Sequence, residues 1–324
     1  MQSWLRQFRF DPIAPLLAHA DTAVSLTARR DLLNERINVQ HLTLHPEAQR
    51  IVRRQQRNGS WIYPSPKEEI RSRENYNQIE TYRNLGYLIE QYSFKSKDPA
   101  IAKAAEYLFR FQSPEGDLRG IYGRQYSPNY TAGITELLIK AGYEKDKRIK
   151  KVFDWLLSIR QADGGWAIPL RTRGKGTAVI SDNSAALAPD VTRPSSHLIN
   201  GVVLRAFAAH PVMRRSKEAK RASELLSASL FTRDKYPDRA DPAYWLRFAF
   251  PFWFTDLISA MDSLSILCPS QPDEKMRKAM DWFVRKQKRN GLWDLKVLKG
   301  RNRDLTNAWL SLAICRIVKR LGSE

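Results

Sequence analysis

Two side chains at the starts of apolar segments have the types needed for acid–base chemistry. His197 lies at the start of segment 196–209, and Asp256 lies at the start of segment 255–267. If the two segments are adjacent helices, the Asp256 carboxylate can orient the His197 imidazole for proton transfer. Alternatively, Asp256 alone is a buried acid with a raised pKa. A histidine in a first helical turn is also commonly a hydrogen-bonded structural residue, so these interpretations stay open.

Other apolar segments begin with polar and aromatic residues that can bind a ligand. These are Tyr76, Asn77, Asn129, Tyr130 and Asn307. Unpaired N–H groups at helix N-termini favour anions, so a ring of such ends can bind a diphosphate or a carboxylate. The asparagines are equally typical N-cap and first-turn residues.

The densest aromatic stretch is 244–254, which contains Trp245 and Trp253. Aromatic faces stabilise cations, so this stretch can form the wall of a cavity in which a carbocation develops. It can also form a patch that enters a membrane interface, with Arg247 at the headgroups. A packed core corner at Pro251 is the third interpretation.

The formal net charge is +20 in 324 residues, which predicts attraction to anions. Candidate partners are an apolar or anionic small molecule, an anionic membrane surface and, less favoured, nucleic acid; a solvated basic surface explains the charge equally well. The two cysteines support neither a disulfide framework nor a cysteine-rich zinc site. The N-terminus lacks a signal-peptide pattern, and no apolar run reaches membrane-spanning length. We therefore expect a cytoplasmic protein, with peripheral membrane contact as the alternative.

A short motif recurs along the chain and predicts how these residues are positioned. A long polar residue is followed four residues later by Gly and six later by Trp in 55–61, 160–166 and 287–293, and by Leu in 112–118. An Asp, Asn or Glu before Gly is typical of tight turns. Such repetition predicts an array in which each unit buries its face against the next.

Two kinds of helix alternate between these turns. Segments 98–111, 147–159 and 273–286 are charged on one face, whereas 129–141, 196–209 and 305–318 are apolar nearly all round. A helix that is apolar on every side is buried on every side. The alternation predicts an all-α protein of about six helix pairs in two concentric rings. We expect a cap at 1–20 and one repeat domain at 21–324.

The turns at 55–61, 160–166 and 287–293 resemble the Gln–Trp motif of the prenyltransferase and squalene-oxidase repeat family, with Arg160 in place of Gln. The chain is similar in particular to small squalene-cyclase-like bacterial proteins of uncharacterised activity. This resemblance spans roughly residues 20–320 and implies the (α/α)6 toroid of terpenoid cyclases and protein prenyltransferases, with a central cavity. The motif is informative about fold and says little about the reaction.

Several motifs of the resembling enzymes are missing. The Asp-x-Asp-Asp motif with which class II cyclases protonate an alkene is absent, as is the Asp-Asp-x-x-Asp metal motif of class I synthases. Cys268 and Cys315 have no histidine near them in sequence, which argues against the zinc site of protein prenyltransferases. We therefore expect no metal and no cofactor.

Two functions remain open from the sequence. In the first, a cavity holds an isoprenoid or other apolar substrate with an anionic head, Asp256 is the acid, His197 is its partner, and Tyr76, Tyr130 and Trp253 line the wall. In the second, the protein has no catalytic activity and binds an anionic ligand or nucleic acid with a basic rim.

Overall fold

The computed structural model describes residues 3–64, 73–176, 185–268, 272–298 and 303–322, and its regular elements in these ranges are helices. Pairing between extended segments there is limited to isolated bridges such as Gln112 with Leu118. The all-α expectation is therefore confirmed.

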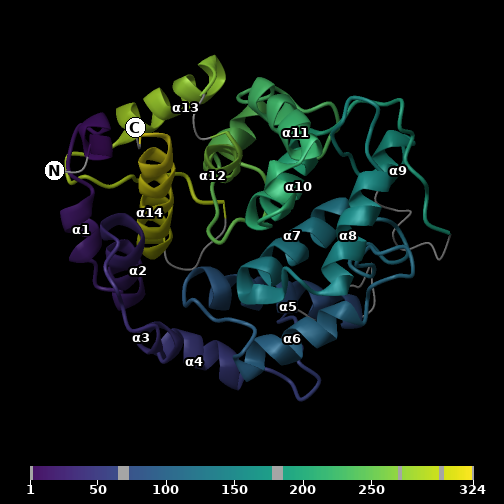
Figure 1. Ribbon diagram of the computed structural model, residues 1–324, viewed down its shortest axis with the longest axis horizontal. Coiled ribbons are helices and arrows are strands. Elements are labelled where there is room, and N and C mark those ends of the chain that lie inside the picture. The colour runs from purple at the N-terminus through teal and green to yellow at the C-terminus, as the bar shows by residue number, and fades with distance from the viewer. Residues whose placement is uncertain (1–2, 65–72, 177–184, 269–271, 299–302, 323–324) are drawn as a thin grey trace.

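Six helix pairs form two concentric rings in the described part of the chain (Figure 1). The inner helices are α2 (Thr22–Leu33), α5 (Arg73–Glu90), α7 (Pro128–Leu138), α10 (His197–Ala209), α12 (Leu257–Leu267) and α14 (Arg303–Leu321). The outer helices are α1 (Ile13–Leu17), α4 (Pro46–Arg53), α6 (Pro99–Phe109), α8 (Lys147–Ser158), α11 (Lys217–Ala228) and α13 (Glu274–Lys286). Helix α14 packs against α2, which closes the ring.

Short helices occupy the connections. They are η1 (Ser3–Gln7), α3 (Gln40–Thr43), η2 (Ile139–Tyr143), α9 (Pro169–Thr172), η4 (Met213–Arg215) and η5 (Pro242–Leu246). The 1–20 segment contacts both ends of the ring, because α1 packs on α2 and the Phe8 ring lies 5.5 Å from the Trp293 ring. Treating this segment as a separate cap stays a prediction.

The burial of each helix follows its sequence pattern. Every residue of α10 from Ile199 to Ala208 is buried, whereas α6 buries one face and exposes Lys103 and Glu106. Outer helices α8 and α13 begin at side-chain caps: the Asp146 carboxylate accepts the Arg148 N–H, and the Asp273 carboxylate accepts the Met276 N–H. Apolar burial on both sides of the inner ring is therefore the main stabilising contribution to the fold.

The tryptophans of the recurring turns hydrogen-bond an outer helix to its inner partner. The indole N–H of Trp166 donates to the Leu156 carbonyl at 2.7 Å, and its main-chain N–H donates to Asn200 Oδ1 at 2.6 Å. Trp61 and Trp293 repeat both bonds with a hydroxyl in place of the amide. These tryptophans are structural, as their place in the motif indicates.

The glutamines of the motif join one repeat to the next. The Gln55 side chain donates to the Ala100 carbonyl at 2.8 Å, at the start of the following outer helix. Gln112 reaches Arg148 in the same way, and Gln287 reaches Phe10 across the seam between the last and first repeats. Where Arg160 replaces the glutamine, the next residue, Gln161, donates to two carbonyls of the 190–193 loop.

Candidate functional site

Asp256 is fully buried at the N-terminal end of α12 and uses only one of its carboxylate oxygens. Its Oδ1 accepts the Ser259 N–H at 2.8 Å, while the Ser259 hydroxyl accepts the Asp256 N–H at 2.9 Å, which is a capping box. Its Oδ2 has no partner with hydrogen-bond geometry among the described residues, although the backbone of Ala249 lies close enough to the carboxyl to lower its pKa. Burial raises the pKa of this carboxyl to about 7, against the opposing effect of its hydrogen bonds and of Arg205. At neutral pH the side chain can therefore hold a proton and donate it.

Arg205 connects this acid to a buried ion network. It lies in the middle of α10, and its Nε donates to Glu136 of α7 at 2.8 Å, while one Nη donates to the Phe254 carbonyl at 3.3 Å. Its Nη2 has no hydrogen-bond partner in the described structure. Glu136 also accepts a bond from Lys140 at 2.7 Å. Burial alone would raise the pKa of Glu136, yet the two cations hold it below the usual value, so the glutamate stays ionised.

An aromatic cluster, formed by Tyr82, Tyr122, Tyr130 and Trp253, lies next to this network. Tyr82 of α5 contacts Tyr130 of α7 edge to face, with ring centroids 6.1 Å apart, and contacts Trp253 at 5.3 Å. Tyr122 contacts Tyr130 at 5.4 Å. Tyr82 is buried among them, and burial raises its pKa against the opposing charge of Arg205. The other three rings are partly exposed, so the cluster reaches solvent.

Small residues on the inner helices make room for this cluster. A Cβ added to Gly133 of α7 would lie 2.6 Å from the Tyr82 hydroxyl, and one added to Gly86 of α5 would overlap the Trp253 ring. The aromatic rings therefore pack directly on helix backbone. The structure places the predicted wall residues Tyr130 and Trp253 together here, around Tyr82, which the sequence analysis did not single out.

The structure pairs His197 with Asp234 and not with Asp256. His197 Nδ1 lies 3.3 Å from Asp234 Oδ2, which also accepts the Ser196 hydroxyl at 2.9 Å. The imidazole lies against Trp245, with centroids 4.7 Å apart. Burial lowers the pKa of His197 against the opposing effect of Asp234, so the imidazole is mainly neutral at pH 7. The expectation that Asp256 orients His197 is wrong, because the carboxylate in contact with the imidazole is that of Asp234.

Trp245 is buried, and its indole N–H donates to the Thr232 carbonyl at 2.9 Å. It therefore lies in the packed wall behind His197 and not with Trp253 in the aromatic cluster. A substrate-binding role for Trp245 stays a prediction.

Asn77 and Asn307 perform matching structural tasks at the first and last turns. Asn77 Oδ1 accepts the Tyr63 N–H at 2.9 Å, and Asn307 Oδ1 accepts the Leu295 N–H at 3.2 Å. Tyr76 packs on Tyr63, with ring centroids 5.0 Å apart. Asn129 differs, because its amide N–H lies 3.4 Å from the Tyr122 hydroxyl and its Oδ1 is buried with no described partner. Binding roles for these four residues remain predictions, and Asn129 is the one that borders the aromatic cluster.

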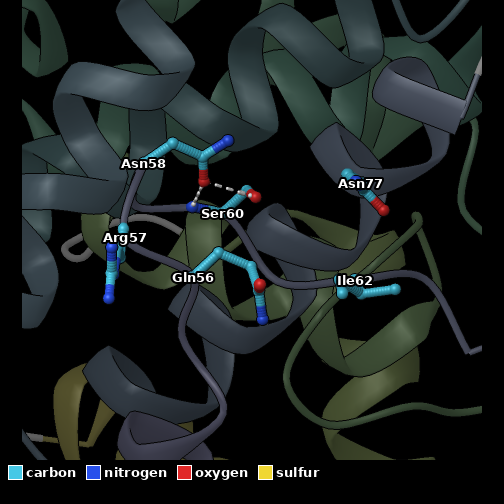
Figure 2. A pocket seen from close by; sticks show the side chains of 6 residues that line it. All are labelled: Gln56, Arg57, Asn58, Ser60, Ile62 and Asn77. Carbon is cyan, nitrogen blue, oxygen red and sulfur yellow. Dashed lines mark hydrogen bonds between the residues drawn. The ribbon is translucent and has the colours of Figure 1, made fainter.

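A pocket of about 490 Å³ lies over the first turn, away from the aromatic cluster. Its lining consists of Gln56, Arg57, Asn58, Ser60, Ile62 and Asn77 (Figure 2). Figure 2 shows the side-chain Oδ1 of Asn58 accepting hydrogen bonds from both the main-chain N–H and the hydroxyl of Ser60, so this side chain is used by the turn itself. The central cavity that the resemblance implies stays a prediction.

The described residues contain no group of three or more His, Cys, Asp and Glu side chains arranged to hold a metal ion. Among the same residues, no helix combines the length and apolarity that a bilayer crossing requires.

Comparison with known proteins finds similarity to squalene–hopene cyclases over parts of the chain. Residues 78–172 match the family model of the squalene-hopene cyclase C-terminal domain. A probable squalene–hopene cyclase of Sinorhizobium fredii is 27% identical over 186 residues, which are 53% of this chain and 27% of that protein. The squalene–hopene cyclase of Bradyrhizobium diazoefficiens is 25% identical over 162 residues, which are 47% and 23% of the two chains. The chain is squalene-cyclase-like.

Solved structures with similar folds include a protein from Actinoplanes, with 13% identity, a TM-score of 0.43 and coverage of 99% of this chain and 90% of that one. Another is the type II terpene cyclase MstE from Scytonema in complex with its substrate geranylgeranyl dihydroxybenzoate, with 10% identity, a TM-score of 0.42 and coverage of 99% and 86%. The squalene-cyclase-like chain spans about a quarter of the length of the two squalene–hopene cyclases it matches.

The residues that match the family model include Tyr82, Tyr130 and Glu136, whereas Asp256 and His197 lie outside them. Sequence reasoning missed Arg205 and Glu136, although a signal was present. Both are charged residues inside helices that are otherwise apolar all round, and such a charge must find a buried partner. In this squalene-cyclase-like protein they are each other's partner, beside the candidate acid.

Proposed function

We propose that this chain binds an apolar, isoprenoid-class ligand against the aromatic cluster and that Asp256 transfers a proton to a carbon–carbon double bond of that ligand. The observation that carries the proposal is the unpartnered Oδ2 of Asp256, a buried acid that can be protonated at neutral pH. A buried polar atom without a partner is rare in folded proteins, and such atoms concentrate at functional sites.

The surroundings of Asp256 support this assignment. Arg205, whose guanidinium interacts with both Asp256 and Tyr82, connects the acid to the aromatic cluster. The cluster offers ring faces and edges from two inner helices, from the connection between α6 and α7 and from the 247–256 segment, and three of its rings are partly exposed. Contact with an aromatic ring stabilises a desolvated cation, and the stabilisation amounts to about 2 kcal/mol or more.

The reaction we propose is an isomerisation or cyclisation. The π electrons of the double bond form a C–H bond to the Asp256 proton, which leaves a carboxylate on Asp256 and a carbocation on the neighbouring carbon. Loss of a different proton to water gives an alkene product, and Asp256 regains a proton from solvent. Substrate and product are therefore isomers, and no oxidant or cofactor takes part.

The test is deuterium incorporation from D₂O. The full chain is incubated with squalene and, separately, with geranylgeraniol. The recovered substrate and its isomers are analysed by mass spectrometry. We expect a new isomer that carries deuterium at a carbon position. Asp256→Asn keeps the α12 cap and should abolish incorporation. The matched control is Asp241→Asn, because Asp241 also caps a helix through its side chain but is exposed. Unchanged incorporation in Asp256→Asn, or none in the wild type with either probe, would refute the proposal.

The basic outer surface favours a second candidate, non-catalytic binding of an anionic polymer. Helices α8 and α11 are neighbours on the outer ring, and they expose Lys147, Lys151, Lys217 and Lys220. Binding of DNA or RNA by this surface would weaken steeply with salt, and its absence near physiological ionic strength would exclude this candidate.

A further inference from the structure

Arg239 has no ion-pair partner among the described residues, although the residue before it in the chain is paired with Arg171. Its neighbour Asp238 forms a two-pronged ion pair with Arg171, with distances of 2.6 and 2.7 Å. Arg239 takes no part in that pair. Its Nη1 is buried and has no hydrogen-bond partner within the described structure. Arg239, in the loop between α11 and η5, is therefore left with an unsatisfied Nη1 within the described structure.

Aromatic rings surround this guanidinium. Its carbon lies 4.0 Å from the centre of the Phe254 ring and 6.0 Å from that of Tyr244. The groups that act on its charge also include Tyr130 and Tyr122 of the aromatic cluster and the carboxyl of Asp256. Burial lowers the pKa of Arg239 below its ordinary value. The protein thus holds a partly desolvated cation at the border of the proposed site, which is unfavourable without a counter-charge.

The backbone at this position is also strained. Arg239 has a φ of 50°, in the left-handed region that a residue other than glycine occupies at a cost of about 1 kcal/mol. Strain of this kind concentrates at ligand-binding positions, where the surrounding structure imposes it. The strain and the absent counter-charge are separate observations on one residue.

We propose that Arg239 binds the anionic head, a carboxylate or phosphate, of an amphiphile whose apolar chain lies on the aromatic cluster. This inference rests on the proposed function and specifies its substrate class. A guanidinium stacked on Phe254 keeps its N–H edge available in the plane of the group, where it can donate two parallel bonds to a carboxylate or phosphate. Such a charge-assisted pair would satisfy Nη1 and fix which end of the amphiphile lies toward Asp256.

The experiment compares four probes with the full chain by isothermal titration calorimetry: dodecyl phosphate, dodecanoate, dodecanol and inorganic phosphate. We expect at least one of the charged amphiphiles to bind about tenfold more tightly than dodecanol, as one charge-assisted hydrogen-bond pair predicts. The tighter of the two identifies the head group. Inorganic phosphate should bind far more weakly than dodecyl phosphate, and equal affinity would make this a site for free phosphate and overturn the proposal.

Arg239→Gln should remove the preference for the charged amphiphile over dodecanol. The matched control is Arg233→Gln, an exposed arginine of the same loop, which should keep the preference. If Arg239→Gln does not fold, Arg239→Lys replaces it: a point charge without the planar fork should weaken the preference several-fold. A preference that survives Arg239→Gln, an undiminished preference in Arg239→Lys, or no preference in the wild type overturns the inference. Dodecanol binding and deuterium transfer by Asp256 test the proposed function separately.

Discussion

The Trp253 ring lies where a side chain at position 86 would have to go. A Cβ built on Gly86, in the middle of α5, would overlap the six-membered ring of the indole. Trp253 also contacts Tyr82 and Tyr87 of the same helix edge to face, at 5.3 and 5.8 Å. The aromatic cluster thus depends on a gap in the side chains of an inner helix.

Gly86→Ala should displace Trp253 without unfolding α5. Alanine favours a helix by about 1 kcal/mol over glycine, so the helix itself is retained. The displaced indole should change tryptophan fluorescence and lower the affinity for dodecanol. The control is Gly176→Ala, because nothing lies within 4 Å of a Cβ there. Identical dodecanol affinity in Gly86→Ala and the wild type would show that Trp253 forms no part of the binding surface.

Two turn glycines allow the cost of backbone strain at positive φ to be measured separately from the cost of a steric collision. Gly59 and Gly174 both have positive φ, 91° and 70°, but a Cβ on Gly59 would collide with the Lys103 carbonyl of α6, whereas one on Gly174 meets nothing. Gly174→Ala should cost about 1 kcal/mol, from backbone strain alone. Gly59→Ala should cost about 1–3 kcal/mol more, because the 55–61 turn and α6 must move apart. Urea unfolding measures both, and equal costs would contradict the close approach.

Asp256 should make the free energy of unfolding depend on pH in an unusual direction. Its folded-state pKa of about 7 lies above the ordinary value of 3.8. The folded protein therefore keeps a proton that the unfolded chain has lost. This contribution to stability is complete below about pH 4 and is lost as the pH rises through 7.

Asp256→Asn cannot titrate at this position and preserves the cap. Relative to this variant, the wild type should lose roughly 4 kcal/mol between about pH 4 and pH 8, the equivalent of three pKa units. Denaturant unfolding at several pH values measures the difference. A difference that does not vary with pH would mean that Asp256 is ionised throughout.

Removing one partner of the buried Arg205–Glu136 pair should destabilise the protein more than replacing both partners with apolar residues. Glu136→Gln leaves the Arg205 guanidinium, whose side chain is 1% exposed, without its counter-charge. We expect a loss of about 3–5 kcal/mol. The double variant Glu136→Leu/Arg205→Met should be more stable than Glu136→Gln. Glu224→Gln, in an exposed pair with Arg221, is the control and should cost less than about 1 kcal/mol. A double variant as unstable as Glu136→Gln would contradict this account.

The sequence predicted the rings well because hydrophobic pattern and turn chemistry are local. The segment expected at 273–286 is the helix Glu274–Lys286, and the all-round apolar segment 196–209 is the helix His197–Ala209, which is buried from Ile199 to Ala208. Both follow from residues within a few positions of each other.

The site was predicted less well because its partners are far apart in sequence. Asp234, which lies beside His197, comes from a loop without any periodic pattern. Arg239 comes from the same loop, and its importance depends on an absent partner, which a sequence does not display. Asp256 was identified as a buried acid, but which of its oxygens is free depends on the position of Ser259 in space.

The bond from Gln287 to Phe10 has a mechanical consequence. Gln55 and Gln112 each donate the same kind of side-chain hydrogen bond to a main-chain carbonyl of the next repeat, and Gln287 makes this bond between the last repeat and the N-terminal segment. A pulling force applied at the N-terminus would therefore act on the bond between Phe10 and the 287–293 turn before it acts on α2. The first contact to break under force should therefore be the one between the 287–293 turn and Phe10, while α14 still packs against α2 and holds the two ends of the fold together.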